Sequence, residues 1–143
     1  MQKTFSYYTT LLYKNFFAHT SEELQKIHLN YGSLPFIIYV GKHPGCTPAE
    51  LTKSIGADWG HSQRSINRLV QEDFLTKEKV IETDRNYHLN LTEQGELAFR
   101  ISHDVFYSWD EEILSALTEE ETSQLFGILE KLIGSLTRKP DMH

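Results

Sequence analysis

The chain has 143 residues, of which 39% are hydrophobic and 24% are charged. These values are ordinary for one globular domain, and they exclude a disordered tail or a fibrous repeat. No apolar run approaches the roughly 20 residues of a membrane-spanning helix, and the N-terminus has no signal-peptide pattern. The single cysteine excludes an internal disulfide framework. We therefore expect a cytoplasmic protein with no membrane partner.

The net charge of -6 is unevenly distributed along the chain. Residues 47–92 carry six basic and seven acidic groups, whereas residues 93–143 carry four basic and eleven acidic groups. Bulk charge therefore predicts no affinity for nucleic acid. Any such binding must come from locally placed basic residues.

The first third of the sequence predicts two helices. Apolar residues recur three and four positions apart in residues 5–17, which is the spacing of one helical face. Residues 20–23 have a capping pattern for a continuation toward Leu29, and residues 30–33 are typical of a turn. Residues 34–42 predict a second helix, in which Pro35 occupies the tolerated first turn.

A closely spaced pair of helices is predicted next. Thr47 is suited to cap the first of them, Pro48 to begin it, and Gly56 to end it in the left-handed conformation. Asp58 is suited to cap the second helix. The apolar positions of this second helix, which are expected to face the core, are Ile66, Leu69 and Val70.

The remaining sequence predicts a hairpin and two further helices. Residues 74–81 and 87–91 have strand patterns and are separated by a polar turn. A long helix begins at residues 92–93, with apolar residues every four positions from Leu97 to Leu117. A capping box at residues 118–121 begins the last helix, which carries a nearly continuous apolar seam from Leu125 to Leu136.

This order of elements is that of a winged helix-turn-helix. The predicted fold class is mostly α with a small two- or three-stranded β-wing, and the outer helices form a dimerisation region. The second helix of such a pair lies in the major groove of DNA, which is about 12 Å wide and admits one helix. The hairpin then reaches the flanking backbone or the minor groove.

The sequence resembles the MarR family of bacterial transcriptional regulators over nearly its whole length. The matching segments are TPAELTKSIGADWGHSQRSINRLVQEDFLTKE and DRNYHLNLTEQGE, and the matching positions are Leu51, Ile55, Gly56, Asp58, Ile66, Leu69 and the signature of Leu91, Thr92 and Gly95. The resemblance implies a single domain over residues 1–143, with a helical dimerisation region in residues 1–31 and 93–143 and a DNA-binding region in residues 32–92. It also implies a homodimer on a pseudo-palindromic operator of double-stranded DNA.

Two positions depart from the family pattern. Family members usually have Asp-Arg-Arg at the wing tip, where this chain has Thr83, Asp84 and Arg85, so we expect weaker wing contacts. The glycine that usually ends the recognition helix is Asp73 here. Aspartate tolerates the left-handed conformation better than most residues, so we expect this change to be mild.

The residues expected to contact DNA lie on the second helix of the pair and at the wing tip. Arginine suits the acceptor edge of guanine, and glutamine or asparagine suits adenine. Polar groups near the helix start suit phosphate. The candidates are Trp59, Gly60, His61, Ser62, Gln63, Arg64, Asn67, Arg68 and Arg85, with Lys53, Lys77 and Lys79 as further phosphate contacts. The plainer interpretation is a solvated helix face, with Trp59 packed as core against the hairpin.

Aromatic residues gather in the outer segments, with nine of the seventeen in residues 1–40. They predict either a pocket for a small aromatic or amphipathic effector or the core of a dimer. The residues proposed to line the effector pocket are Tyr8, Tyr13, Tyr39, Phe106 and Trp109.

Other kinds of site find little support. No catalytic constellation is present, so we expect no enzyme, no catalytic residue and no cofactor. Seven histidines, the last of them His143, are scattered without metal-ligand spacing, so we expect no metal site. Cys46 follows Lys42 and His43 closely, and it is either a redox sensor or an inert buried side chain.

The function expected from these features is that of a dimeric, sequence-specific DNA-binding regulator of transcription, and specifically of a repressor released by a small-molecule effector. Two alternatives remain open. One is a winged-helix protein-interaction module that has lost DNA binding, and the other is a regulator that responds to oxidation of Cys46.

Overall fold

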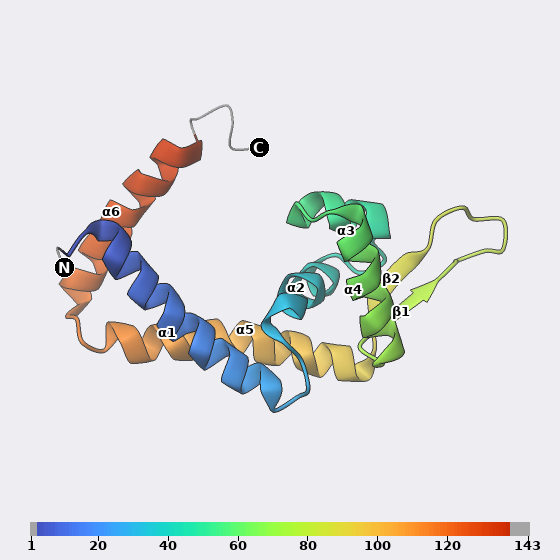
Figure 1. Ribbon diagram of the computed structural model, residues 1–143, viewed down its shortest axis with the longest axis horizontal. Coiled ribbons are helices and arrows are strands. Elements are labelled where there is room, and N and C mark those ends of the chain that lie inside the picture. The colour runs from blue at the N-terminus through green and yellow to red at the C-terminus, as the bar shows by residue number, and fades with distance from the viewer. Residues whose placement is uncertain (1–2, 138–143) are drawn as a thin grey trace. The chain divides into compact units, whose positions relative to one another are not determined.

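The structure is a computed structural model that describes residues 3–137. His143 lies outside the described residues. In chain order the elements are α1 (Phe5–Gln25), the 3-10 turn η1 (Tyr31–Ser33), α2 (Leu34–Lys42), α3 (Pro48–Ile55), α4 (Trp59–Gln71), β1 (Leu75–Glu78), β2 (His88–Leu91), α5 (Glu93–Leu114) and α6 (Glu119–Thr137) (Figure 1). The predicted fold class, mostly α with a small β-wing, is confirmed.

The chain divides into two compact units, one ending at Tyr107 and the other beginning at Ser108, so the division falls inside α5. The first unit holds α1 to α4, the sheet and most of α5, and the second holds the end of α5 and α6. Assignment of these parts to DNA binding and dimerisation stays a prediction. None of the helices within residues 3–137 has the length and apolar content that a bilayer crossing requires.

Side-chain caps fix the boundaries of α3 and α4 where the sequence predicts them. Thr47 Oγ accepts a hydrogen bond of 3.1 Å from the Glu50 amide, and Gly56 ends α3 with a left-handed φ of 67°. Asp58 Oδ2 accepts a 3.1 Å hydrogen bond from the His61 amide and begins α4. Only residues 56–58 therefore separate the two helices, which is the short turn that a helix-turn-helix needs.

The core of the first unit lies around α2, which contacts α3 and β2. α2 is buried on most of its surface, as its continuous apolar sequence requires. In α4, Ile66 and Leu69 are buried as predicted and Val70 is half-buried. The buried apolar cluster consists of Leu24, Leu29, Leu34, Phe36, Ile37, Val40, Cys46, Leu51, Ile66, Leu69, Phe74, Leu75, Leu89 and Ala98.

The two strands of the wing are shorter than predicted. They pair antiparallel, with Leu75 opposite Leu91. Val80 and Ile81 belong instead to the wing loop of residues 79–87, where they are 76% and 61% exposed. Apolar, β-branched residues favour a strand only where a partner strand is available. Figure 1 shows this loop projecting beyond the helices of the first unit.

Two predicted patterns in the long helices are wrong. α1 runs without a break through residues 20–23, because Thr20 and Leu24 are buried on its packed face and hold the helix together there. In α5 the buried residues are Gly95, Ala98, Ser102 and Val105, whereas Leu97 is exposed. A four-residue repeat turns about 40° per step around a helix of 3.6 residues per turn, so the predicted stripe drifts away from the core.

In the second unit, α6 begins at the predicted capping box. Glu121 Oε1 accepts a hydrogen bond of 3.0 Å from the Thr118 amide, and Thr118 Oγ accepts one of 3.1 Å from the Glu121 amide. The apolar seam of α6 is exposed over Ile128, Leu129, Leu132, Ile133 and Leu136. The seam is therefore a surface of this unit rather than its core.

Candidate nucleic-acid interface

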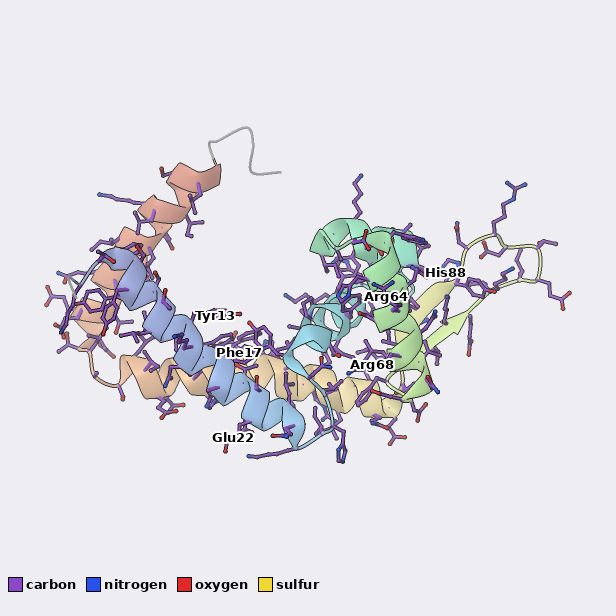
Figure 2. The ribbon with its side chains drawn as sticks, in the orientation of Figure 1. Tyr13, Phe17, Glu22, Arg64, Arg68 and His88 are labelled. Atoms are coloured by element: carbon purple, nitrogen blue, oxygen red, sulfur yellow. The ribbon has the colours of Figure 1, made fainter. Side chains whose placement is uncertain are left out.

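One face of α4 is buried in the core, and this determines which residues of the helix point toward solvent on the opposite face. Ser62, Ile66 and Leu69 are buried, at the spacing of four and three that marks one side of a helix. The polar residues between them therefore point outward. The exposed candidates on α4 are Trp59, His61, Arg64, Asn67 and Arg68, and Figure 2 shows Arg64 and Arg68 along the helix.

Ser62 does not belong to the exposed face, so its predicted contact with phosphate is wrong. Its side chain is fully buried, and its Oγ lies 2.5 Å from Thr52 Oγ of α3. Thr52 Oγ donates its own hydrogen to the Pro48 carbonyl at 2.7 Å, so Ser62 is the donor in the pair. The signal was present in the sequence, because Ser62 lies four residues before Ile66. Ser62 therefore joins α4 to α3 inside the core.

Trp59 lies on the surface at the start of α4 and does not pack as core against the hairpin. Its side chain is 54% exposed. It lines an open cavity of about 290 Å³ between the α3 start, α4 and the wing loop. The other lining residues are Thr47, Pro48, Ala49, Gln63, Lys77, Arg85, Asn86 and Tyr87. The cavity therefore brings together four of the candidates: Trp59 and Gln63 of α4, Lys77 of β1 and Arg85 of the wing loop.

Gln63 is the half-buried candidate in this cavity. Within residues 3–137 its Nε2 is buried and has no hydrogen-bond partner. A buried amide without a partner costs roughly 1–3 kcal/mol. A group with an acceptor oxygen that enters the cavity can therefore be recognised by this amide.

The charged residues of α4 differ in how strongly the protein itself engages them. Arg68 Nε lies 3.4 Å from Glu72 Oε1, and both side chains are about half exposed. Such a pair is worth at most about 1 kcal/mol, so a phosphate can replace Glu72. Among the described residues Arg64 forms no ion pair. A Cβ at Gly60 would lie 3.3 Å from both Arg64 Nη1 and Asp58 Oδ2, so a side chain there would crowd this guanidinium.

The wing adds Lys77 and the ring of Tyr87 to the cavity, and Lys79 lies beside that ring. Lys77 Nζ donates a 3.3 Å hydrogen bond to Asn67 Oδ1 and so links β1 to α4. Lys77 and Lys79 lie 5.0 and 5.1 Å from the centre of the Tyr87 ring, within cation–π range. Arg85 is exposed at the tip. Sequence analysis missed Tyr87, because its alternation with Leu89 and Leu91 indicated a strand face rather than a platform for cations.

Cys46 is inert in this structure. Its side chain is buried and lies next to Leu89 of β2 through a backbone bridge. Burial, and secondarily the charge of Glu50, raises the pKa of the thiol to about 11. Oxidation proceeds through the thiolate, which is scarce at neutral pH at this position. Burial and the raised pKa therefore favour the inert buried side chain over the redox sensor at Cys46.

The five residues proposed to line an effector pocket do not line one common cavity in the part of the chain that the structure describes; each has different neighbours. Phe106 stacks on Phe16 with ring centres 5.5 Å apart and lines a cavity of about 130 Å³ with Tyr31 of η1. Tyr8 lies edge-on to Tyr7, and Tyr39 lies against His43. Tyr13 lies near Phe17 on α1 (Figure 2), and Trp109 belongs to the second unit. Tyr31, which sequence analysis missed, joins the rings of Phe16 and Phe17.

In the described part of the chain, no three or more potential metal ligands lie close enough together to hold a metal ion.

No protein-family model matches the chain.

Comparison with individual proteins is more informative. The chain is 42% identical over 132 residues to the HTH-type transcriptional regulator BilQ of Clostridium symbiosum, covering 92% of both proteins. The crystal structure of FabT from Streptococcus pneumoniae in complex with DNA has the same fold, with a TM-score of 0.80, 23% identity and coverage of 92% of this chain and 94% of FabT. Reduced MarR from E. coli gives a TM-score of 0.77 at 20% identity, covering 92% and 98% of the two chains.

The fold and the relatives define a class of proteins, the helix-turn-helix regulators of transcription, which are not enzymes. The chain belongs to the MarR family of winged helix-turn-helix transcriptional regulators.

Proposed function

We propose that the protein is a homodimeric, sequence-specific DNA-binding repressor that reads the major groove with α4 and the flanking DNA with the wing. The observation that carries this proposal is the outward face of α4. Arg64, Asn67 and Arg68 project from a helix whose other face is fixed by buried side chains. The wing residue Arg85 borders the same cavity as the start of α4. FabT, which shares the fold, is known in complex with DNA.

Dimerisation is proposed from apolar faces that the two units expose separately. On α1, Phe5 and Tyr13 are 63% and 56% exposed, and on α6, Ile133 is 57% exposed. Contiguous apolar faces of this kind are typical of protein interfaces. A second copy of the chain is the simplest partner, since soluble oligomers are mostly symmetric dimers. A two-fold dimer requires a pseudo-palindromic operator with half-sites roughly 10 base pairs apart.

Release by an effector is proposed from the ring cluster of Phe16, Phe17, Tyr31 and Phe106. Two cavities border Tyr31, of about 130 and 370 Å³. The smaller is lined by apolar side chains and the larger also by Ser21, Gln25 and Asn30. This combination suits a small aromatic or amphipathic molecule. Ligand binding here would act through α2, which packs on α3, the first helix of the pair.

The proposal is tested by selecting bound sequences from a pool of random DNA duplexes and footprinting the winner. We expect two protected half-sites whose centres are about one helical turn apart, and light scattering is expected to give the mass of two chains bound to one duplex. Recovery of no preferred sequence, or of a single half-site bound by one chain, would contradict the proposal. The first of these results would favour a protein-interaction module.

A further inference from the structure

His88, the first residue of β2, joins the wing loop to the segment that precedes α3. Its Nδ1 lies 2.9 Å from the Gly45 carbonyl oxygen, and its Nε2 lies 2.9 Å from Asp84 Oδ2. Asp84 belongs to the wing loop, where its carboxylate also accepts a 2.9 Å hydrogen bond from the Asn86 amide. Figure 2 shows His88 where β2 meets this loop. We call Gly45, Asp84 and His88 the wing latch.

The partners in the wing latch specify the protonation state that forms it. A carbonyl oxygen and an ionised carboxylate only accept hydrogen bonds. A neutral imidazole has one N–H and satisfies one of them, whereas an imidazolium has two N–H groups and satisfies both. The geometry therefore fits a protonated His88, and loss of the proton breaks one of the two bonds.

The charges around His88 favour the same state. The hydrogen bond to the Gly45 carbonyl, and next the hydrogen bond to Asp84, raise the pKa of His88 above its ordinary value. Glu50 on α3 contributes in the same direction. The Asn86 amide and His88 lower the pKa of Asp84, with a smaller contribution from Lys79. Asp84 is therefore a carboxylate throughout the range in which His88 titrates.

The segment on the other side of the latch is itself well held. The Gly45 amide donates a 2.8 Å hydrogen bond to the Leu89 carbonyl, and the Leu89 amide donates one of 2.8 Å to the Cys46 carbonyl. Gly45 is thus fixed to β2 by the backbone, whatever the state of His88. The link to Asp84 is the part that holds the wing loop, and Arg85 is the next residue along that loop.

We infer that His88 is a positioning residue for DNA binding, because its imidazolium holds the wing loop in place and so presents Arg85 to the DNA backbone. The inference rests on the proposed DNA-binding function. It goes beyond that function by making the affinity for DNA depend on a proton. Below the pKa of His88 the latch is closed and Arg85 is in place. As the pH rises through this pKa, His88 loses its positive charge and one of its two N–H groups. The charge-assisted hydrogen bond to Asp84 is therefore weakened or lost, the wing loop is held less firmly, and affinity falls.

The test is the affinity for a random-sequence 30-base-pair duplex, measured by fluorescence anisotropy from pH 5.5 to 8.5 at constant ionic strength. Binding by the wild-type protein is expected to weaken by about threefold to tenfold across this range, the scale on which one phosphate contact counts. The midpoint should lie above about 6.5, the ordinary pKa of histidine. His88→Gln is expected to remove this step and to match the wild type at pH 8.5, where the wild-type latch is open.

Two further variants separate the latch from general effects of charge and folding. Asp84→Asn keeps an acceptor oxygen but removes the charge, so it should move the midpoint to lower pH. His103→Gln, on the exposed face of α5 beside Asp104, is the matched control and should leave the pH profile unchanged. An imidazole titration by NMR follows His88 itself, and a thermal melt at pH 8.5 confirms that the variants are folded.

The outcomes are distinguishable. If His88→Gln keeps the wild-type pH profile, or if His88 titrates at or below its ordinary pKa, the latch is wrong while DNA binding stands. If the wild-type protein binds no duplex at any pH, both the latch and the proposed function are wrong. A step that is lost in His88→Gln, shifted in Asp84→Asn and kept in His103→Gln supports the latch.

Discussion

Replacing Gly95 by alanine is expected to destabilise the protein by about 3 kcal/mol or more, because an added Cβ would lie 2.1 Å from the Phe74 carbonyl oxygen. The obstacle is backbone and cannot rotate away. The start of α5 is held at this point, since Thr92 Oγ donates a 2.6 Å hydrogen bond to the Asp73 carbonyl and accepts one of 3.0 Å from the Gly95 amide. Denaturant unfolding gives the free energy of unfolding directly.

Gly127→Ala is the matched control for this variant. It also replaces a glycine within a helix, but a Cβ there meets nothing within 4 Å. By helical geometry Gly127 faces away from the apolar seam of α6, so a dimer would leave it exposed. Alanine is expected to stabilise this helix by roughly 0.5–1 kcal/mol. Equal effects of the two substitutions would show that the close approach of α5 to Phe74 is absent in solution.

Arg64→Ala is expected to cost about 1–3 kcal/mol in binding to the selected operator and to blur preference at one base position. The guanidinium lies on the outward face of α4 and is engaged by no ion pair among the described residues, so it can reach a base edge in the major groove. Its exposure predicts an unchanged melting temperature. A large fall in the melting temperature would instead show that Arg64 has a structural role. An unchanged affinity for the operator would show that Arg64 does not contribute to recognition of the DNA sequence by α4.

Arg85→Ala serves as the contrasting variant on the wing. Its contact is expected to be electrostatic, so operator and random duplex should be weakened nearly alike. The slope of log K against log salt should become shallower by about 0.9, the amount that corresponds to one phosphate contact. The comparison of the two arginines, each measured on operator and random DNA, separates base reading by α4 from backbone contact by the wing.

The sequence predicted the parts of the fold that local chemistry controls. Caps at Thr47, Asp58 and Thr118 and the left-handed residue Gly56 are all formed. Asp73, which replaces a family glycine, adopts the expected left-handed conformation with φ 67°. Each of these features depends on a single residue or on residues three or four apart. The sequence alone therefore contains the information that determines them.

The features that sequence analysis predicted wrongly or missed are those that depend on tertiary contacts. Val80 and Ile81 have the apolar, β-branched character of a strand, but the sequence does not show where pairing between the two strands ends, and both residues lie beyond that point. The sequence indicates a polar surface position for Ser62, because its hydrogen-bond partner Thr52 lies ten positions away on another helix and cannot be inferred from local spacing. The His88 latch was invisible for the same reason, since Gly45 and Asp84 meet at His88 only when the wing folds against the segment before α3. Spacing within one helix carries no such information.

The measurement that tests the central claim most directly is a salt titration of binding to random duplex DNA. If α4 and the wing form a DNA-binding surface, log K should fall linearly with log salt, by about 0.9 for each phosphate neutralised, and a dimer with two such surfaces should give a slope steeper than about -3. A flat dependence, or no detectable binding at about 50 mM salt, would contradict the account and leave a winged-helix module that binds protein instead.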